Sequence, residues 1–339
     1  MKIVTFGEVM LRLAPHGYER FLQAHELEAT FGGGEANVAV SLANFGMDAS
    51  FVTKLPENDV AQSAINSLRK YGVDTKHIAR GGERVGIYYL EKGASQRASQ
   101  VIYDRAHSSI SEASSKDFNW FEIFDGADWF HFTGITPALS DTIAQLTKEA
   151  CIAAKEQGLM ISCDLNFRKK LWSSEKAEAV MSEIMPYVDI CIANEEDSEK
   201  VFGIHAADSD ITSGVLHHDG YIQVAKQLSE RFHFKAVAIT LRESISASDN
   251  NWAAMLYMDN QAYFSKTYPL HIVDRVGGGD SFGAGLIYSM LKKKAPQDCI
   301  EFAVAASCLK HSIEGDYNLV RVHEVEQLVN GDGSGRVQR

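Results

Sequence analysis

The chain has 339 residues, a formal net charge of −12 at pH 7 and 45% hydrophobic residues. This length and hydrophobic content are typical of a globular α/β protein with a sizeable core, and the acidic balance argues against a nucleic-acid partner held through its phosphates. No apolar run is long enough to span a membrane, and the first residues predict a strand rather than a signal peptide. We therefore expect a cytoplasmic protein with no membrane partner.

Strand-like and helix-like segments alternate along most of the chain. The residue pattern predicts strands at 2–6, 51–55, 127–132, 159–165, 188–193 and 234–241, two short strands within 252–268, and helices at 58–71, 140–158, 220–232 and 297–311. This alternation predicts a mostly parallel sheet with crossover helices.

A run of three glycines, Gly32 to Gly34, opens a helical pattern that ends near Gly46. One interpretation is a glycine turn that leads into a core helix. The other is a site where a ligand approaches the backbone at Gly33 and Gly34, with Asn37 offering both a donor and an acceptor. The segment alone leaves both interpretations open.

Residues 85–105 interrupt the alternation. Two strands at 85–91 and 100–105, joined by a polar turn, cannot stand alone in water. We expect them to pair with short strands near 14–31 and form a small second sheet. Because one face of such a sheet would be apolar and open, a second copy of the chain is expected to cover it, which predicts a homo-oligomer.

Polar residues follow several of the predicted core strands. Asp164, Asn166 and Arg168 lie at the end of the 159–165 strand, and Asn194 follows the 188–193 strand. In open α/β sheets these carboxyl ends face the ligand crevice. A binding site is therefore expected along this edge of the sheet.

The stretch from Asp274 to Asp280 combines three glycines with an aspartate just before a helical pattern. The backbone N–H groups of Gly277, Gly278 and Gly279 can form a concavity that attracts anions at the helix N-terminus. A carboxylate beside such a cradle suits phosphoryl transfer, where Asp280 would take the proton of the attacking hydroxyl. The plainer alternative is a glycine-rich turn with Asp280 as a helix cap.

Two segments resemble the signatures of the PfkB (ribokinase-like) carbohydrate kinases. The Asp274–Asp280 stretch is similar to the family's Asp-Thr-x-Gly-Ala-Gly-Asp, with Arg275 in place of threonine and Gly278 in place of alanine. The segment from Gly32 to Asn37 resembles the N-terminal signature, which contacts the sugar in that family. The two signatures stand in the family's order at opposite ends of the chain.

The resemblance implies a ribokinase-like α/β fold, with a central, mostly parallel sheet, helices on both of its faces and a small β-sheet lid over the sugar. It implies the following division of the chain: a kinase core at 1–13, 32–84 and 106–329, and a lid at 14–31 and 85–105. The last ten residues, 330–339, are rich in Gly with Asp and Arg, a composition that predicts a mobile tail.

It also implies ATP as phosphoryl donor and Mg²⁺ as cofactor. Asp280 would be the general base, and Asn194 and Thr240 would lie beside the nucleotide. Asp197 stands where the family has glutamate, which suggests contact with magnesium through a water molecule. Asp274 would line a site for a monovalent cation such as K⁺. Arg242 follows Thr240 where the family usually has a glycine-rich turn.

The substrate is indicated by polar residues of the predicted lid and strand ends. Tyr89, Tyr103 and Arg105 lie on the lid strands, and Arg168 matches the family's Asp-x-Asn-x-Arg pattern. Paired arginines suit a carboxylate, and these residues resemble those of family members that phosphorylate the sugar acid 2-keto-3-deoxygluconate.

Other functions remain to be weighed. A fructokinase or ribokinase would share the same signatures with a neutral sugar. A dinucleotide-binding oxidoreductase would need G-x-G-x-x-G directly after the first strand, whereas Gly32 lies well beyond residues 2–6. A non-catalytic sugar-binding protein would be expected to lack the base, yet Asp280 is present.

Overall fold

The structure is a computed structural model that describes residues 1–194, 196–205, 218–331 and 333. The tail predicted at 330–339 therefore lies largely outside the described residues. Nine strands of the described part form one sheet in the order β14-β13-β12-β11-β10-β9-β1-β4, with β15 pairing to β13. None of the described helices is both long and apolar enough to cross a membrane.

The central sheet is mostly parallel, as predicted. Its parallel strands are β1 (Lys2–Phe6), β4 (Asp48–Val52), β9 (Trp129–Thr133), β10 (Met160–Asp164), β11 (Ile190–Asn194) and β12 (Ala236–Ser244). An antiparallel edge follows, made of β13 (Asp249–Met258), β14 (Gln261–Phe264) and β15 (Tyr268–His271). The two short strands predicted within 252–268 are thus one long strand and two short ones. Asp259 and Asn260 have positive φ angles of 52° and 61° and form the two-residue hairpin turn that reverses the chain.

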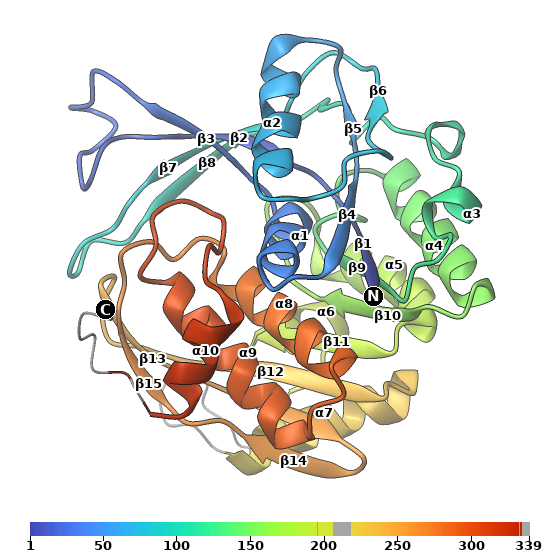
Figure 1. Cartoon of the computed structure of the whole chain (residues 1–339), viewed down its shortest axis with the longest axis vertical. Helices are drawn as coiled ribbons and strands as arrows, with labels where there is room; N and C mark the ends of the chain where they lie inside the picture. The colour runs from blue at the N-terminus through green and yellow to red at the C-terminus, as the bar shows by residue number, and fades with distance from the viewer. Residues whose placement is uncertain (195, 206–217, 332, 334–339) are drawn as a thin grey trace.

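Helices cover both faces of this sheet (Figure 1). One face packs against α1 (Gly34–Asn44), α2 (Asp59–Lys70), α8 (Gly278–Leu291), α9 (Pro296–Lys310) and α10 (Val322–Val329). The other packs against α3 (Trp120–Ile123), α4 (Asp141–Glu156), α5 (Ser174–Ile184), α6 (Asp197–Phe202) and α7 (His218–Phe232). A small parallel pair, β5 (Lys54–Leu55) and β6 (Ala79–Arg80), lies outside the central sheet.

Helix α8 is buried almost throughout because small residues let its neighbours approach. A Cβ at Gly285 would lie 2.9 Å from the Cα of Ala303 in α9, closer than real Cβ contacts. The helix carries the predicted catalytic aspartate in its first turn. Tight packing between α8 and α9 therefore fixes the position of that turn.

The second sheet contains β3 (Glu28–Gly32), β2 (Met10–Ala14), β7 (Ile87–Glu91) and β8 (Gln100–Asp104), in that order. In Figure 1 it projects to the upper left of the main body. Strand β2 was predicted to belong to the core segment 1–13, but β1 ends at Phe6 and the chain then crosses to pair with β3 and β7. We call these four strands the lid sheet.

Strand β8 is the edge of the lid sheet, and four of its five residues are exposed. Strand β10 lies inside the central sheet between two parallel neighbours. Few buried contacts give a segment low local stability. In hydrogen–deuterium exchange measured by mass spectrometry, we expect amides of β8 to exchange faster than those of β10. Equal protection of the two strands would show that the lid sheet is as rigid as the core.

Candidate active site

A cavity of about 390 Å³ crosses the carboxyl ends of the parallel strands. Strands β9 and β12 are three positions apart in the sheet, which separates them by roughly 14 Å. The cavity can therefore accept two ligands side by side, in the place where open α/β sheets bind them. Most of the predicted site residues line it: Gly33, Gly34, Asn37, Tyr103, Arg105, Arg168, Asn194, Asp197, Thr240, Gly277, Gly279 and Asp280.

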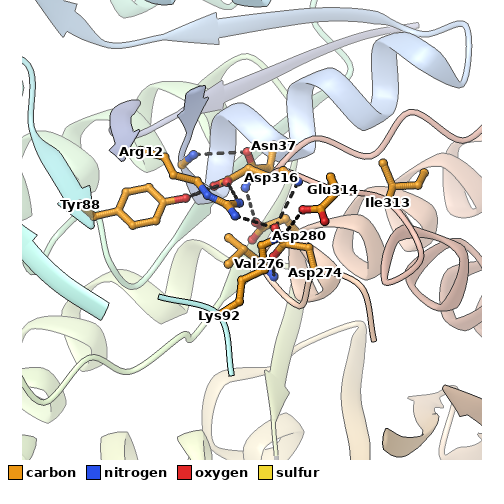
Figure 2. A network of polar contacts seen from close by, with 12 residues as sticks. Arg12, Asn37, Tyr88, Lys92, Asp274, Val276, Asp280, Ile313, Glu314 and Asp316 are labelled. Carbon is orange, nitrogen blue, oxygen red and sulfur yellow. Dashed lines mark hydrogen bonds and ion pairs between the residues drawn. The ribbon is translucent and has the colours of Figure 1, made fainter. Parts of the chain in front are cut away.

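Asp280 lies in the first turn of α8 and is held by a residue of α1. The Nδ2 of Asn37 donates to its Oδ2 at 2.7 Å, and Figure 2 shows the two side chains pointing toward each other. Burial raises the pKa of Asp280 to about 7, although the Asn37 hydrogen bond opposes the rise. A carboxylate with a pKa near neutrality can take up a proton and release it at physiological pH. Asn37 was predicted as a sugar contact, and orienting the base is a further role that the sequence did not indicate.

Two of the glycines are required by close backbone contacts. A Cβ at Gly277 would lie 2.1 Å from the carbonyl oxygen of Asp316, and the residue has a φ of 81°. A Cβ at Gly33 would lie 1.9 Å from the carbonyl oxygen of Glu8. Side chains at either position would push apart the loops that surround the cavity.

Gly278 and Gly279 differ in their surroundings. A Cβ at Gly278 would lie 2.4 Å from the ring of His311, and its N–H donates to the carbonyl of Arg275 at 3.4 Å. Among the described residues the cavity is lined by Gly277 and Gly279, not by Gly278. The predicted contact of the Gly278 amide with the transferring group therefore stays a prediction. A Cβ at Gly279 would meet no atom within 4 Å.

Gly278 is therefore a glycine that packing requires, whereas Gly279 is one that would leave room for a ligand. We expect Gly279→Ala to leave the thermal unfolding midpoint unchanged or slightly higher, because alanine is the better helix former. The added methyl group would stand over the start of α8 and lower phosphoryl-transfer activity by at least tenfold. Gly283→Ala is the matched control in the same helix, since its Cβ would make ordinary contact with Ile192 at 3.5 Å. Equal activity of the two variants would mean that no ligand approaches Gly279.

The hydrogen bond from Asn37 should be visible in the pH profile. Because a base must be deprotonated, kcat/KM should fall about tenfold per pH unit below a pH of about 7. Asn37→Ala removes a donor that stabilises charged Asp280, so the acid limb should move to higher pH. Asn44→Ala, which removes an amide from the end of the same helix, should leave the limb in place. An unchanged limb in Asn37→Ala would contradict this account of the base.

The lid contributes Tyr88 rather than Tyr89. Side chains alternate along a strand, and in β7 it is Tyr88 that is buried and lines the cavity. The ring of Tyr89 instead packs edge-on against Phe21 at 6.5 Å, so the prediction for Tyr89 is wrong. Tyr103 pairs with Tyr88 across the sheet and lines the cavity, as predicted.

The two predicted arginines differ in their partners. Arg105 is buried and forms an ion pair with Glu8, whose Oε2 accepts from its Nε at 2.8 Å. Arg105 therefore already has a counter-charge within the chain and does not need a substrate carboxylate to supply one. Arg168 is exposed at the cavity rim and donates to the carbonyl of Phe167, and it forms no ion pair with any described residue. The second oxygen of Glu8 is buried without a hydrogen-bond partner in the described chain, and Glu8 is one of the residues that line the cavity.

At the other end of the cavity, Asn194 and Asp197 stabilise the turn between β11 and α6. The Oδ1 of Asn194 accepts from the backbone N–H of Asp197 at 3.0 Å, and the Asp197 carboxylate accepts from the N–H groups of Asn194 and Phe167. These bonds give Asp197 a structural role, and its predicted contact with magnesium stays a prediction. Thr240 on β12 lines the cavity beside them.

Two arginines that depart from the family pattern also line this end. Arg275 donates to the carbonyl of Ala247 at 2.8 Å, and its pKa is lowered by burial and then by nearby Arg242. Two guanidinium groups this close attract an anion with several negative oxygens. Their position fits a nucleotide phosphate.

A buried ion-pair network joins the lid to the loop before α8 (Figure 2). Arg12 of β2 donates to Asp274 at 2.6 Å and to Asp316 at 2.8 Å, and the hydroxyl of Tyr88 also donates to Asp316. The Asp274 carboxylate, predicted to line a cation site, thus binds a guanidinium group instead. Neither Arg12 nor Asp316 was predicted, because single charged residues far apart in the chain carry no local signal.

A buried carboxylate at a glycine-rich helix N-terminus, beside a cavity that a second small sheet borders, agrees with the resemblance to ribokinase-like carbohydrate kinases. The sequence pattern of the pfkB family of carbohydrate kinases matches residues 1–321. The chain belongs to this family.

Individual relatives support the assignment over the whole chain. The chain is 31% identical to a 2-dehydro-3-deoxygalactonokinase of Haloferax volcanii, over 98% of each chain. It is 52% identical to the crystal structure of a 2-dehydro-3-deoxygluconokinase from Thermotoga maritima, with a TM-score of 0.94 and 98% of each chain covered. A putative ribokinase II from E. coli in complex with ATP and Mg²⁺ shares the fold at 19% identity, with a TM-score of 0.81 over 97% of this chain and 99% of that one.

Proposed function

We propose that this carbohydrate kinase transfers the γ-phosphoryl group of ATP to a hydroxyl of 2-keto-3-deoxygluconate, also called 2-dehydro-3-deoxygluconate. The observation that carries the proposal is Arg168, a cation on the cavity rim with no ion-pair partner among the described residues. A sugar acid offers it a carboxylate, with which arginine forms forked, charge-assisted hydrogen bonds. The relative that is 52% identical is named for this substrate.

The cavity supports in-line transfer between two ligands. Asp280 takes the proton of the sugar hydroxyl, whose oxygen attacks the γ-phosphorus as the bond to the β-phosphate oxygen breaks and ADP leaves. The N-terminus of α8, with Gly277 and Gly279 facing the cavity, stabilises the negative charge of the transferring group. The lid residues Tyr88 and Tyr103 exclude water from the sugar side.

Magnesium fits this cavity as a companion of the nucleotide. No cluster of three potential ligands capable of holding a metal ion occurs among the described residues, and Mg²⁺ is commonly held by substrate phosphates, waters and one or two carboxylates. Asp164 lines the cavity, and its pKa is raised well above the usual range by burial and by the nearby charges of Asp197 and Asp280. This carboxylate would hold the ion directly or through water, and the ion would neutralise phosphate charge. From the sequence, Asp164 was placed at a strand end within the Asp-x-Asn-x-Arg pattern, with no metal assigned to it.

We further propose a cytoplasmic homo-oligomer that forms through the lid sheet. Strand β8, on the free edge of the sheet, leaves Ile102 53% exposed on the face opposite Tyr103. An exposed apolar strand edge favours pairing with a second chain.

The acid preference should depend on Arg168. Arg168→Ala should lower kcat/KM for 2-keto-3-deoxygluconate by roughly ten- to a hundredfold, the effect of one charge-assisted hydrogen bond, and leave the weaker activity on fructose unchanged. Arg105→Ala should impair both substrates, because it leaves Glu8 buried without its partner. A coupled assay of ADP release measures all variants.

Lys169→Ala is the matched control, since it removes an adjacent exposed positive charge that does not line this cavity. The galactonate epimer belongs in the same panel, because the relative that is 31% identical is named for it. A parent enzyme that prefers fructose would replace the sugar-acid proposal with a neutral-sugar kinase. Equal losses on both substrates in Arg168→Ala would remove Arg168 from substrate selection.

A further inference from the structure

The space behind the glycine cradle contains a second buried cation, Lys310 at the end of α9. Its side chain is fully buried, and its Nζ donates to the carbonyl oxygens of Asp274 at 3.4 Å and Ile313 at 3.1 Å. A Cβ placed on Gly277 would lie 3.3 Å from its Cε. The ammonium group therefore lies directly behind the backbone that faces the transferring phosphate.

Charge in this space is already balanced. Arg12 binds the carboxylates of Asp274 and Asp316, and these two acids outweigh the effect of burial, so the pKa of Arg12 rises above its ordinary value. Burial raises the pKa of Asp316 despite Arg12. Burial lowers the pKa of Lys310, and the charges of Asp274, Asp316 and, more weakly, Asp280 oppose that fall. Since Arg12 and Lys310 already offset the charges of Asp274 and Asp316, a further cation would gain little attraction there for the cost of its desolvation.

The ligands that a monovalent metal ion would need are also in use. The resemblance to the family placed such an ion at Asp274, but the carboxylate of that residue binds Arg12 and the N–H groups of Val276 and Gly315, and its carbonyl binds Lys310. The residues of this chain do not fit the ion.

We propose that Lys310, together with Arg12, takes the place of the monovalent cation, so that phosphoryl transfer by this enzyme requires neither K⁺ nor Na⁺. Lys310 acts as a positioning residue. Its ammonium group joins the loop that contains Asp274 to the loop that contains Ile313 and supplies a fixed positive charge beneath Gly277. This inference rests on the proposed kinase activity but not on the identity of the sugar.

The first test uses the unmodified enzyme. Phosphoryl transfer from the magnesium salt of ATP, prepared without sodium or potassium, is measured in tetramethylammonium chloride and in potassium chloride at the same ionic strength. We expect kcat and the thermal unfolding midpoint to agree in the two salts. Activation by K⁺ of several-fold, or a midpoint raised by K⁺, would overturn the proposal.

The second test replaces Lys310 with a residue that still fills its site or with one that leaves the site empty. Lys310→Met should lose roughly ten- to a hundredfold in kcat, and no salt should restore it, because the methionine still fills the site. Lys310→Ala should also be impaired in tetramethylammonium but should recover activity and gain thermal stability as K⁺ or NH₄⁺ is added. Lys292→Ala, at the exposed end of neighbouring α8, is the control and should behave like the parent in both salts.

A purely structural role for Lys310 predicts impairment of Lys310→Ala that no cation relieves, and that result would overturn the proposal. If Lys310→Ala does not fold, the salt comparison on the parent enzyme still decides the question. Failure of the proposed function would give a distinct result, because a parent enzyme without sugar-acid kinase activity would not phosphorylate 2-keto-3-deoxygluconate in either salt. In that case the salt comparison is made with whichever sugar of the panel is phosphorylated.

Discussion

The buried contact of Arg12 with Asp274 and Asp316 is the constraint on which the rest of the active site depends. It joins the lid strand β2 to the loop before α8 and to the loop after α9, three segments far apart in the chain. Gly32 makes the contact possible, since a Cβ there would lie 1.9 Å from the Asp316 carboxylate. Removing one partner of such a pair leaves a charge buried alone, which is more destabilising than losing an exposed ion pair.

Because of this contact, the lid sheet helps to hold the loop before α8 in place. The hydroxyl of Tyr88 donates to Asp316 on the face of β7 that borders the cavity, and Lys92, just after β7, forms an ion pair with Glu314. A sugar that contacts the lid therefore contacts a sheet whose buried side chains also fix the backbone beside Gly277. Lid and phosphate cradle form one electrostatic unit, although one is a sheet from the N-terminal part of the chain and the other is the N-terminus of α8.

The parts of the site that could be predicted are those that depend on residues close together in the sequence. The glycines followed by Asp280 predict a helix N-terminus and a base, and the alternation of strands and helices predicts the parallel sheet. Register is harder, because a shift of one residue exchanges the faces of a strand, and Tyr89 was chosen where Tyr88 faces the cavity. Ion pairs between residues far apart in the chain cannot be predicted from local sequence patterns. The partner of Arg105 and the network around Arg12 could therefore be identified only from the structure.

The charges around Asp280 suggest how substrate binding and base strength are linked. Burial raises the pKa of Asp280 to about 7, and Arg168 is among the groups that oppose the rise. A sugar carboxylate that pairs with Arg168 would neutralise the positive charge that favours ionised Asp280, and the pKa of Asp280 would rise. A base with a higher pKa accepts the hydroxyl proton more readily, provided that the solution pH keeps it ionised. Because the pKa of Asp280 already lies at about 7, this rise would move the acid limb of the pH–rate profile to higher pH for a sugar acid, whereas a neutral sugar would leave the field of Arg168 in place.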